Sequence, residues 1–390
     1  MNDPAARRRV LERFGATGAT CDELLEYNHP DYAVAGTPGF SWPPAVPLPA
    51  EPHLVAWRAY EAEARAGGVW PVLRAKLYQL RFPIGAGMSQ SPEYVSATRK
   101  GILPPADTPL PELEAPDRLQ LRIHASPAGE IPVLTAGSRA DFAFLVRALT
   151  KRNEPSTVPD SMGACMVAGL NNWDRISAHR RAWEQTAADR SDAAWAAEFA
   201  SLTMHKELYQ DRFIVLGTGG YSGIAAAELD LAAERWANLT ATIRVEHECV
   251  HYLTKRVFGR MRTNALDELL ADYAGISAAL GRFRASWFLR FVGLEAFPDY
   301  REGGRLQNYK GNPPLSDPAF RVLCRLVHQA ALNLERFAHE RDHADPPAMV
   351  ERTAELLAIA GFSLEALAEE ASPVALRAAL AEVRRHLGGG

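Results

Sequence analysis

The chain has 390 residues, of which 47% are hydrophobic and 23% charged, and its formal net charge is −4 at pH 7. This composition is typical of soluble globular proteins with one to three domains, and the weak negative charge favours neither nucleic acid nor an anionic membrane as a partner. No apolar run reaches the roughly 18 residues of a membrane span, and the N-terminus lacks the apolar segment of a secretory signal, so we expect a cytoplasmic protein.

Proline divides the predicted elements into two parts. Twenty of the 27 prolines precede residue 160, and they shorten the elements there because proline interrupts both helices and strands. In this first part we expect, in chain order, a helix over 54–80 with a break near Gly67, strands over 118–124 and 131–137, a helix over 141–152 and an irregular segment over 154–173.

The second part is mainly helical. The amphipathic stretch 191–210 predicts a helix, and the apolar run 213–217 predicts a short buried strand before a glycine-rich loop at 218–223. Further helices are expected over 225–257, 264–283, 286–297, 317–340, 347–360 and 373–387. Together these elements predict an α+β protein that is predominantly helical, with a small sheet in its first two thirds.

One stretch has the pattern of a metal site, the H-E-x-x-H motif from His247 to His251. Two histidines four residues apart share one face of a helix, and neutral imidazoles in that arrangement can bind one zinc ion. Glu248 lies one step further round the helix, beside the metal and not bound to it. We therefore expect Glu248 to act as the general base that activates a metal-bound water.

A second acidic pattern follows at residues 267–272, the sequence Asp-Glu-Leu-Leu-Ala-Asp. Glu268 comes 17 residues after His251, which is enough chain to end one helix near Gly259 and to return a second helix to the metal. We expect Glu268 to be the third ligand, with the neighbouring Asp267 as the alternative. Asp272, one turn later, is expected to accept the second ring N–H of a ligand histidine.

The two patterns together resemble the gluzincin metallopeptidases, the thermolysin-like group, over about 30 of the 390 residues. The resemblance implies one zinc ion, a zincin-like catalytic region and cleavage of a peptide or of a small amide. It also implies a side chain that steadies the oxyanion, for which Tyr309, His328 and Tyr221 are candidates. The strand at 213–217 is the candidate to pair with an extended substrate.

Other interpretations stay open. The histidines can be ordinary residues of a helix, and the two carboxylates a solvated helix face. A second H-E-x-x-H at residues 339–343 has charged residues at its centre and is followed by prolines, so we interpret it as the polar end of a helix. Its Glu340 and His343, paired with Glu248 and His251, give the alternative function, a di-iron carboxylate oxygenase in a helical bundle.

A structural zinc site is a third alternative, but such sites usually have four protein ligands rich in cysteine. The four cysteines here are scattered, without a C-x-x-C pair, which predicts free thiols. We therefore predict a zinc-dependent hydrolase. Its expected regions are a Pro-rich N-terminal part (1–117), a zincin-like catalytic region (118–300) and a C-terminal helical lobe (301–390); the oligomeric state is left open.

Overall fold

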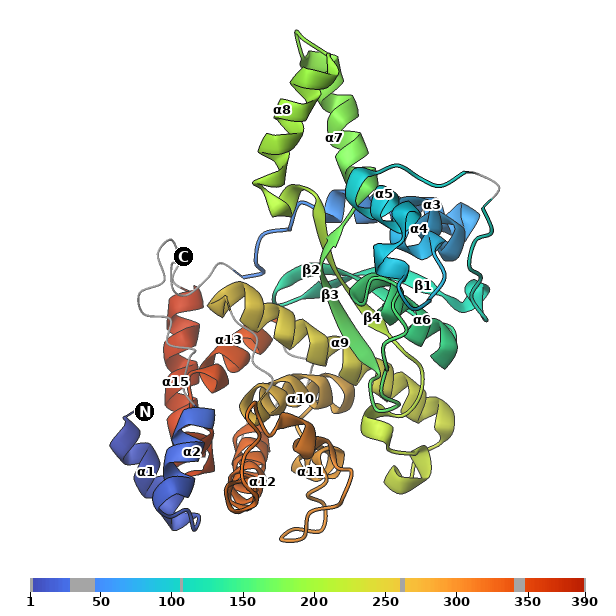
Figure 1. Cartoon of the computed structure of the whole chain (residues 1–390). Coiled ribbons are helices and arrows are strands. Elements are labelled where there is room, and N and C mark those ends of the chain that lie inside the picture. Colours follow the sequence, from blue (N-terminus) through green and yellow to red (C-terminus); the bar gives the residue numbers. More distant parts are fainter. Residues whose placement is uncertain (1–2, 29–45, 106–107, 260–263, 340–347, 389–390) are drawn as a thin grey trace. The chain divides into compact units, whose positions relative to one another are not determined.

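The computed structural model describes residues 3–28, 46–105, 108–259, 264–339 and 348–388 (Figure 1). Its contacts divide the chain into two compact units. The helical unit comprises Met1–Pro49, Ser126–Gly129 and Gly220–Gly390, and the sheet unit comprises Ala50–Ala125 and Glu130–Gly219. These boundaries differ from those of the three predicted regions, whose status as domains stays a prediction.

The sheet unit contains a mixed sheet of four strands in the order β1-β2-β4-β3. Strand β2 pairs with β4 in parallel, with Val133 opposite Ile214, whereas β3 pairs with β4 antiparallel. The strands are β1 (Gln120–Ser126), β2 (Gly129–Thr135), β3 (Ala164–Asn171) and β4 (Gln210–Leu216). The helices are α3 (Leu54–Gly67), α4 (Val69–Lys76), η1 (Tyr78–Arg81), η2 (Met88–Gln90), α5 (Pro92–Lys100), η3 (Pro116–Arg118), α6 (Arg139–Thr150), α7 (Trp173–Thr186), α8 (Asp192–Thr203) and η4 (Lys206–Leu208).

Helices α3, α4 and α6 form the apolar core of this unit together with the sheet. Trp57, Trp70 and Phe142 contribute the large side chains of the helices, and Phe213 and Val215 contribute those of β4. These residues alternate along β4, as expected where every second side chain of a strand points to one face. Burial of this apolar surface is what holds the helices against the sheet.

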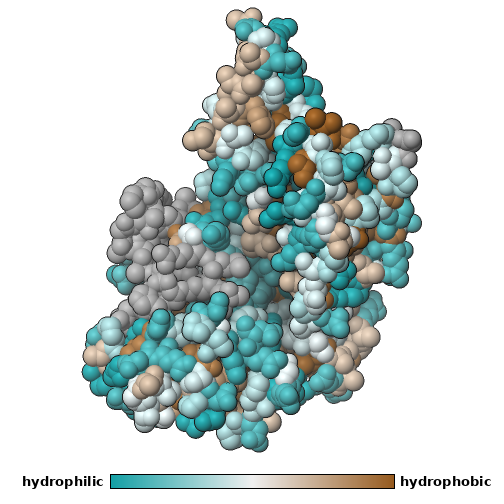
Figure 2. Space-filling model, in the orientation of Figure 1, coloured by the Kyte–Doolittle hydropathy of each residue, from teal (hydrophilic) through white to brown (hydrophobic). Residues whose placement is uncertain are grey.

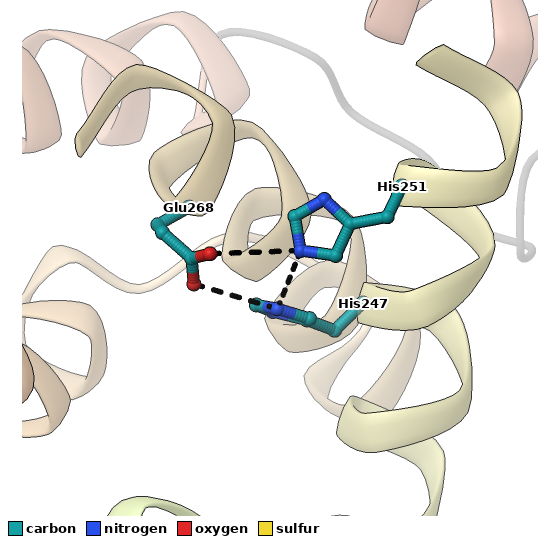
Figure 3. A group of neighbouring side chains, drawn as sticks. All are labelled: His247, His251 and Glu268. Carbon is teal, nitrogen blue, oxygen red and sulfur yellow. Dashed lines mark hydrogen bonds and ion pairs between the residues drawn. The ribbon is translucent and has the colours of Figure 1, made fainter. Parts of the chain in front are cut away.

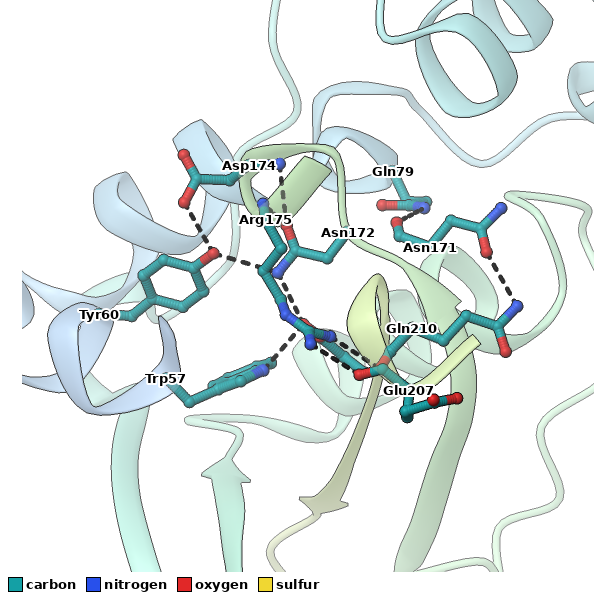
Figure 4. A network of polar contacts seen from close by, with 10 residues as sticks. Trp57, Tyr60, Gln79, Asn171, Asn172, Asp174, Arg175, Glu207 and Gln210 are labelled. Atoms are coloured by element: carbon teal, nitrogen blue, oxygen red, sulfur yellow. Dashed lines mark hydrogen bonds and ion pairs between the residues drawn. The ribbon is translucent and has the colours of Figure 1, made fainter. Parts of the chain in front are cut away.

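A buried polar network connects α3 and α7 with strand β4 of the sheet (Figure 4). The carboxylate of Asp211 accepts hydrogen bonds from Trp57 Nε1 at 2.8 Å, Asn172 Nδ2 at 2.7 Å and Arg175 Nη1 at 2.8 Å. Asn172 also donates to the Tyr60 hydroxyl at 3.1 Å. Because a buried charge without partners is costly, these contacts link α3, the start of α7 and β4 in one arrangement.

The helical unit is built around α9 (Ala233–Phe258) and α10 (Ala265–Leu280), which pack side by side. The other elements of this unit are α1 (Pro4–Arg13), α2 (Gly18–Tyr27), η5 (Tyr221–Gly223), η6 (Ala226–Leu229), α11 (Ala285–Val292), η7 (Arg305–Tyr309), α12 (Asp317–His339), α13 (Met349–Ala360), α14 (Leu364–Ala368) and α15 (Ser372–Gly388). A buried ion pair between Arg7 and Glu365 joins α1 to α14.

The prediction of an α+β, predominantly helical chain with a small sheet is confirmed. The predicted helix over 54–80 is broken at Gly68, whose φ of 80° ends α3, and all four cysteines have free thiols. The irregular segment predicted over 154–173 is wrong, because it contains β3. The glycine at 169, which suggested a loop, occupies a bulge between Ala168 and Leu170.

The expectation that the strand at 213–217 pairs with an extended substrate is also wrong. This segment belongs to β4, which lies between β2 and β3 and is hydrogen-bonded on both sides. Its backbone groups are therefore occupied and cannot pair with a substrate. Helices α1, α2, α5, α7 and α14 were not predicted.

Hydrophilic residues cover most of the face shown in Figure 2, and hydrophobic ones form small separate groups. The large hydrophobic side chains that are exposed are Val55, Ile102, Met204, Leu208, Val350 and Val374. Most of them come from different elements, and scattered exposure of this kind is ordinary for a protein surface. None of the described helices has the length and apolar character needed to cross a membrane.

Candidate metal centre

The paired helices α9 and α10 carry the predicted ligands. Helix α9 ends at Gly259, which has the left-handed φ of 69° typical of a helix C-terminus. Helix α10 begins after Asn264, whose side chain accepts the N–H of Asp267 at 3.1 Å. A Cβ on Gly275 would lie 2.7 Å from the carbonyl oxygen of Ile243. A glycine is therefore needed where the two helices meet most closely.

His247, His251 and Glu268 converge at this helix pair (Figure 3). Nε2 of His247 lies 3.0 Å from Nε2 of His251 and 3.5 Å from Oε2 of Glu268. Nε2 of His251 lies 3.6 Å from Oε1 of Glu268. All three side chains are buried. The predicted convergence is confirmed, and Glu268, rather than Asp267, faces the rings.

The two rings differ in their electrostatic surroundings. Burial lowers the pKa of His247, but the hydrogen bond to Asp272 and the nearby Glu268 outweigh it and raise that pKa above its usual value. Burial and the charge of His247 hold the pKa of His251 well below its usual value. The pair therefore carries at most one proton between its facing nitrogens, and a cation can replace that proton.

Asp272 lies behind His247, on the side away from His251. Its Oδ1 is 2.8 Å from Nδ1 of His247 and accepts the Tyr221 hydroxyl at 2.5 Å. Arg305 donates to Oδ2 of Asp272 and, at 2.8 Å, to the Tyr221 hydroxyl. Asp272 therefore contacts His247 as predicted, and the role of His247 as a metal ligand stays a prediction. A proton on Nδ1 suits this contact, and with Nε2 deprotonated the ring would present a lone pair to a cation.

Glu248 follows His247 on α9 and is partly exposed. Burial of its carboxyl group and repulsion by Glu268 raise its pKa to about 7, although His247 and Arg305 lower it. A carboxylate with a pKa near neutrality can both accept and release a proton at physiological pH. This property suits a general base, which stays a prediction for this residue.

The three candidates for the oxyanion role occupy different places. The Tyr309 hydroxyl hydrogen-bonds to Glu268, so this residue lies at the centre. The ring of His328 stacks on Phe297, with centroids 4.0 Å apart, and none of its described contacts connects it with the histidine pair. The hydroxyl of Tyr221 contacts Asp272 and Nδ1 of His247, on the side of the ring away from His251.

Two residues of the centre were missed from the sequence. Arg305 lies in η7, in a glycine-rich segment where no periodic pattern indicates a role. Tyr27, at the end of α2, accepts the N–H of Ala265 at 3.0 Å and donates to the carbonyl oxygen of Tyr309 at 2.6 Å. It thereby links the start of α10 with Tyr309. Only the tertiary structure brings these distant residues together.

The fold and this centre define a predominantly helical α+β protein with a buried His-His-Glu cluster that could hold a metal ion. The chain belongs to a family of unknown function (DUF7005), whose sequence model matches residues 9–371. No curated protein and no solved structure matches it. Glu340 and His343, which the oxygenase alternative requires, lie outside the described residues.

Proposed function

We propose that this chain is a zinc-dependent hydrolase that cleaves a peptide or amide bond. The observation that carries the proposal is the convergence of two imidazole nitrogens and one carboxylate at 3.0–3.6 Å from one another in a buried place. Ligand atoms held about 2.0–2.1 Å from a tetrahedral zinc ion lie about 3.3–3.4 Å apart. The three separations therefore fit one zinc ion with a fourth position open.

Two orphaned atoms support a cation at this place. Oε2 of Glu268 is buried and has no hydrogen-bond partner among the described residues. Nδ1 of His251 is buried without a described partner as well. If that atom carries the proton of His251, two nitrogen lone pairs face each other at 3.0 Å. A cation between them turns this repulsion into coordination.

The chemistry follows from the residues around the open position. When bound, zinc polarises a carbonyl group and lowers the pKa of water. Glu248 takes one proton from a water molecule while the oxygen of that water adds to the carbonyl carbon. The carbon–nitrogen bond then breaks, and Glu248 passes the proton to the leaving nitrogen. Asp272, Tyr221 and Arg305 hold the ring of His247 in one orientation throughout.

We infer a zincin-like arrangement for α9 and α10, because an active-site helix with H-E-x-x-H followed by a helix with the third ligand is the pattern that the sequence resembles. Tyr309 is the candidate to steady the oxyanion, since its hydroxyl lies at the ligand carboxylate. A peptide is the default substrate, and a small amide is the alternative. In either case, the carbonyl group of the substrate would approach the fourth, open position of the proposed ion, beside Glu248.

The test is Glu248→Gln in the full-length protein, with metal content from elemental analysis and turnover on a fluorogenic peptide library. We expect one zinc ion per chain in both proteins, and a loss of turnover of at least about a hundredfold in the variant. Glu234→Gln, in the exposed first turn of α9, is the matched control and should retain both. Two iron atoms per chain, or loss of the metal from Glu248→Gln, would overturn the proposal.

A further inference from the structure

A cavity of about 450 Å³ lies within the sheet unit, and none of its lining residues belongs to the metal centre. Its walls come from α5, the end of α6 and the segment after it, η1, η2 and β3. Polar side chains include Gln79, Tyr94, Thr98, Arg99, Thr150 and Arg152. In the described part of the chain no aspartate or glutamate lines it. Its size is that of a site for a small molecule.

One buried polar atom at this cavity has no partner among the described residues. Oε1 of Gln79 is an acceptor on a side chain that is only 5% exposed, and it has no hydrogen bond within the described part of the protein. Arg99 and Arg152 also line the cavity; their side chains are exposed and make no ion pair with another described residue. The hydroxyl of Tyr94, whose side chain is 4% exposed, is a further donor. A buried polar group normally finds a partner, so the unpartnered oxygen of Gln79 points to a ligand in this cavity.

The backbone beneath the cavity is held in a strained form. Arg152 and Asn153 have φ values of 51° and 60°, a region that costs about 1 kcal/mol or more for most residues other than glycine and that asparagine tolerates better. Asn153 stabilises this turn by donating to the carbonyl oxygens of Gln79 and Phe82 at 3.1 and 2.8 Å. Gln79 in turn donates to the carbonyl oxygen of Asn171 at 3.2 Å (Figure 4). These bonds fix Gln79 and Arg152 at the cavity.

The carboxylate of Glu154, two residues after Arg152, makes no ion pair with Arg99 or Arg152 in the described part of the chain. It accepts the backbone N–H groups of Gly87 and Ser89 at 3.0 and 2.8 Å. Its negative charge therefore stabilises the turn that contains Ser89. The cavity keeps two cationic donors, a phenolic donor and one amide acceptor.

The outer strand of the cavity argues against a peptide as the occupant. Strand β3 lies at the edge of the sheet, where an added strand could pair. The bulge between Ala168 and Leu170 interrupts its regular pairing, and bulges make an edge a poor template for another strand. The same strand supplies Ala168 and Gly169 to the cavity wall, so the irregular stretch is the part that faces the occupant.

We propose that this cavity binds a small organic anion, with its phosphate or carboxylate group on Arg99 and Arg152 and a hydroxyl or N–H group donating to Gln79. Arginine forms strong charge-assisted hydrogen bonds with both kinds of oxyanion. Tyr94 donates a further hydrogen bond. The site is independent of the metal centre, whose ligands belong to the helical unit.

The experiment is calorimetric titration of the full-length protein with inorganic phosphate and, separately, with succinate at constant ionic strength. We expect saturable binding at one site. Arg99→Gln and Arg152→Asn should each weaken it by about tenfold or more. Asparagine tolerates the positive φ of residue 152. Tyr94→Phe, which removes one hydroxyl group, should weaken it less.

Lys100→Gln and Lys151→Gln are the matched controls, since both lysines are exposed neighbours of the arginines that do not line the cavity. They should change the affinity by less than about twofold. Dialysis against a chelator should leave the binding unchanged. Tighter binding of phosphate indicates a phosphorylated ligand, and tighter binding of succinate a carboxylate. Absence of saturable binding by both, or equal losses in the lysine and arginine variants, overturns the proposal.

Discussion

At the scale of single residues, the centre depends on which atom of His247 carries a proton. Nδ1 faces Asp272 and Tyr221, whereas Nε2 faces His251 and Glu268. Asp272 is fully buried, and Arg305 and the hydrogen bonds from His247 and Tyr221 outweigh burial and lower its pKa. A carboxylate with a lowered pKa favours a proton on Nδ1, which would leave Nε2 to face the proposed metal.

Removal of the charge from Asp272 should therefore weaken zinc binding without removing a ligand. For Asp272→Asn we expect a loss of zinc affinity of about 10–100-fold, measured by competition with a chelator. Asp267→Asn is the control, because Asp267 is as buried but lies outside the ligand group; its zinc affinity should stay near that of the wild type. An unchanged affinity of Asp272→Asn would contradict the role of this carboxylate in orienting His247.

His53, in the sheet unit, should make stability depend on pH. It is 2% exposed, and burial lowers its pKa to about 4, although Glu51 raises it. Between pH 6.5 and 4 the unfolded chain takes up a proton that the folded chain does not. The free energy of unfolding should therefore decrease as the pH is lowered from 6.5 to 4, by about 3 kcal/mol in total.

Denaturant unfolding of the wild type and of His53→Gln at a series of pH values measures this contribution. The difference between the two proteins should change across the window and stay constant above pH 7. His386→Gln, at an exposed histidine, serves as the control. Parallel pH profiles for the wild type and His53→Gln would show that His53 is protonated in the folded state as well.

At the scale of elements, the contact of α9 with α10 sets the distance between the ligands. Gly275 lies one turn after Asp272, and Ile243 one turn before His247. A methyl group at 275 would lie 2.7 Å from the carbonyl oxygen of Ile243 and 3.1 Å from its side chain. The helices would have to separate, and Glu268 would move away from the histidines.

For Gly275→Ala we expect a loss of stability and a loss of zinc affinity, although alanine normally stabilises a helix relative to glycine. The free energy of unfolding should fall by about 1–3 kcal/mol, as for other overpacked sites, and zinc affinity should fall with it. Ala278→Ser adds an atom at an exposed position of the same helix and should leave zinc affinity unchanged. Should Gly275→Ala stabilise the protein, the close contact would not exist in solution.

At the scale of the whole molecule, the ligands all belong to the helical unit. The proposed zinc ion would bind the folded chain, in which the three side chains meet, better than the unfolded chain. It should therefore raise the free energy of unfolding by about 4 kcal/mol at a free concentration of 1,000 times Kd. Hydrogen exchange should slow most in α9 and α10.

Thermal unfolding with added zinc, and with a chelator, measures the stabilisation. Glu268→Gln keeps the shape of the side chain but loses its charge, so its Tm should respond much less to zinc. Magnesium, which prefers oxygen ligands, is the control ion and should have little effect on the wild type. Equal zinc responses of the wild type and Glu268→Gln would indicate that the ion binds elsewhere.

The sequence alone determined the local part of this centre. A period of 3.6 residues puts His247 and His251 on one face of a helix, and the same rule aligns Glu268 with Asp272. The helical period of apolar residues and the glycine at 259 placed the end of α9 and both ends of α10 to within three residues, whereas α9 begins at Ala233, eight residues after its predicted start. These features depend on near neighbours in the chain, which is why the pattern was sufficient.

Tertiary structure decided the rest. Tyr27, Tyr221 and Arg305 reach the centre from three distant segments, and no local pattern indicates such long-range contacts. Strand β3 exists because it pairs with β4, although its glycine suggests a loop. The place of β4 inside the sheet was likewise fixed by its partners. Pairing and packing between distant segments depend on the complete fold, whereas helical periodicity is a property of a few successive residues.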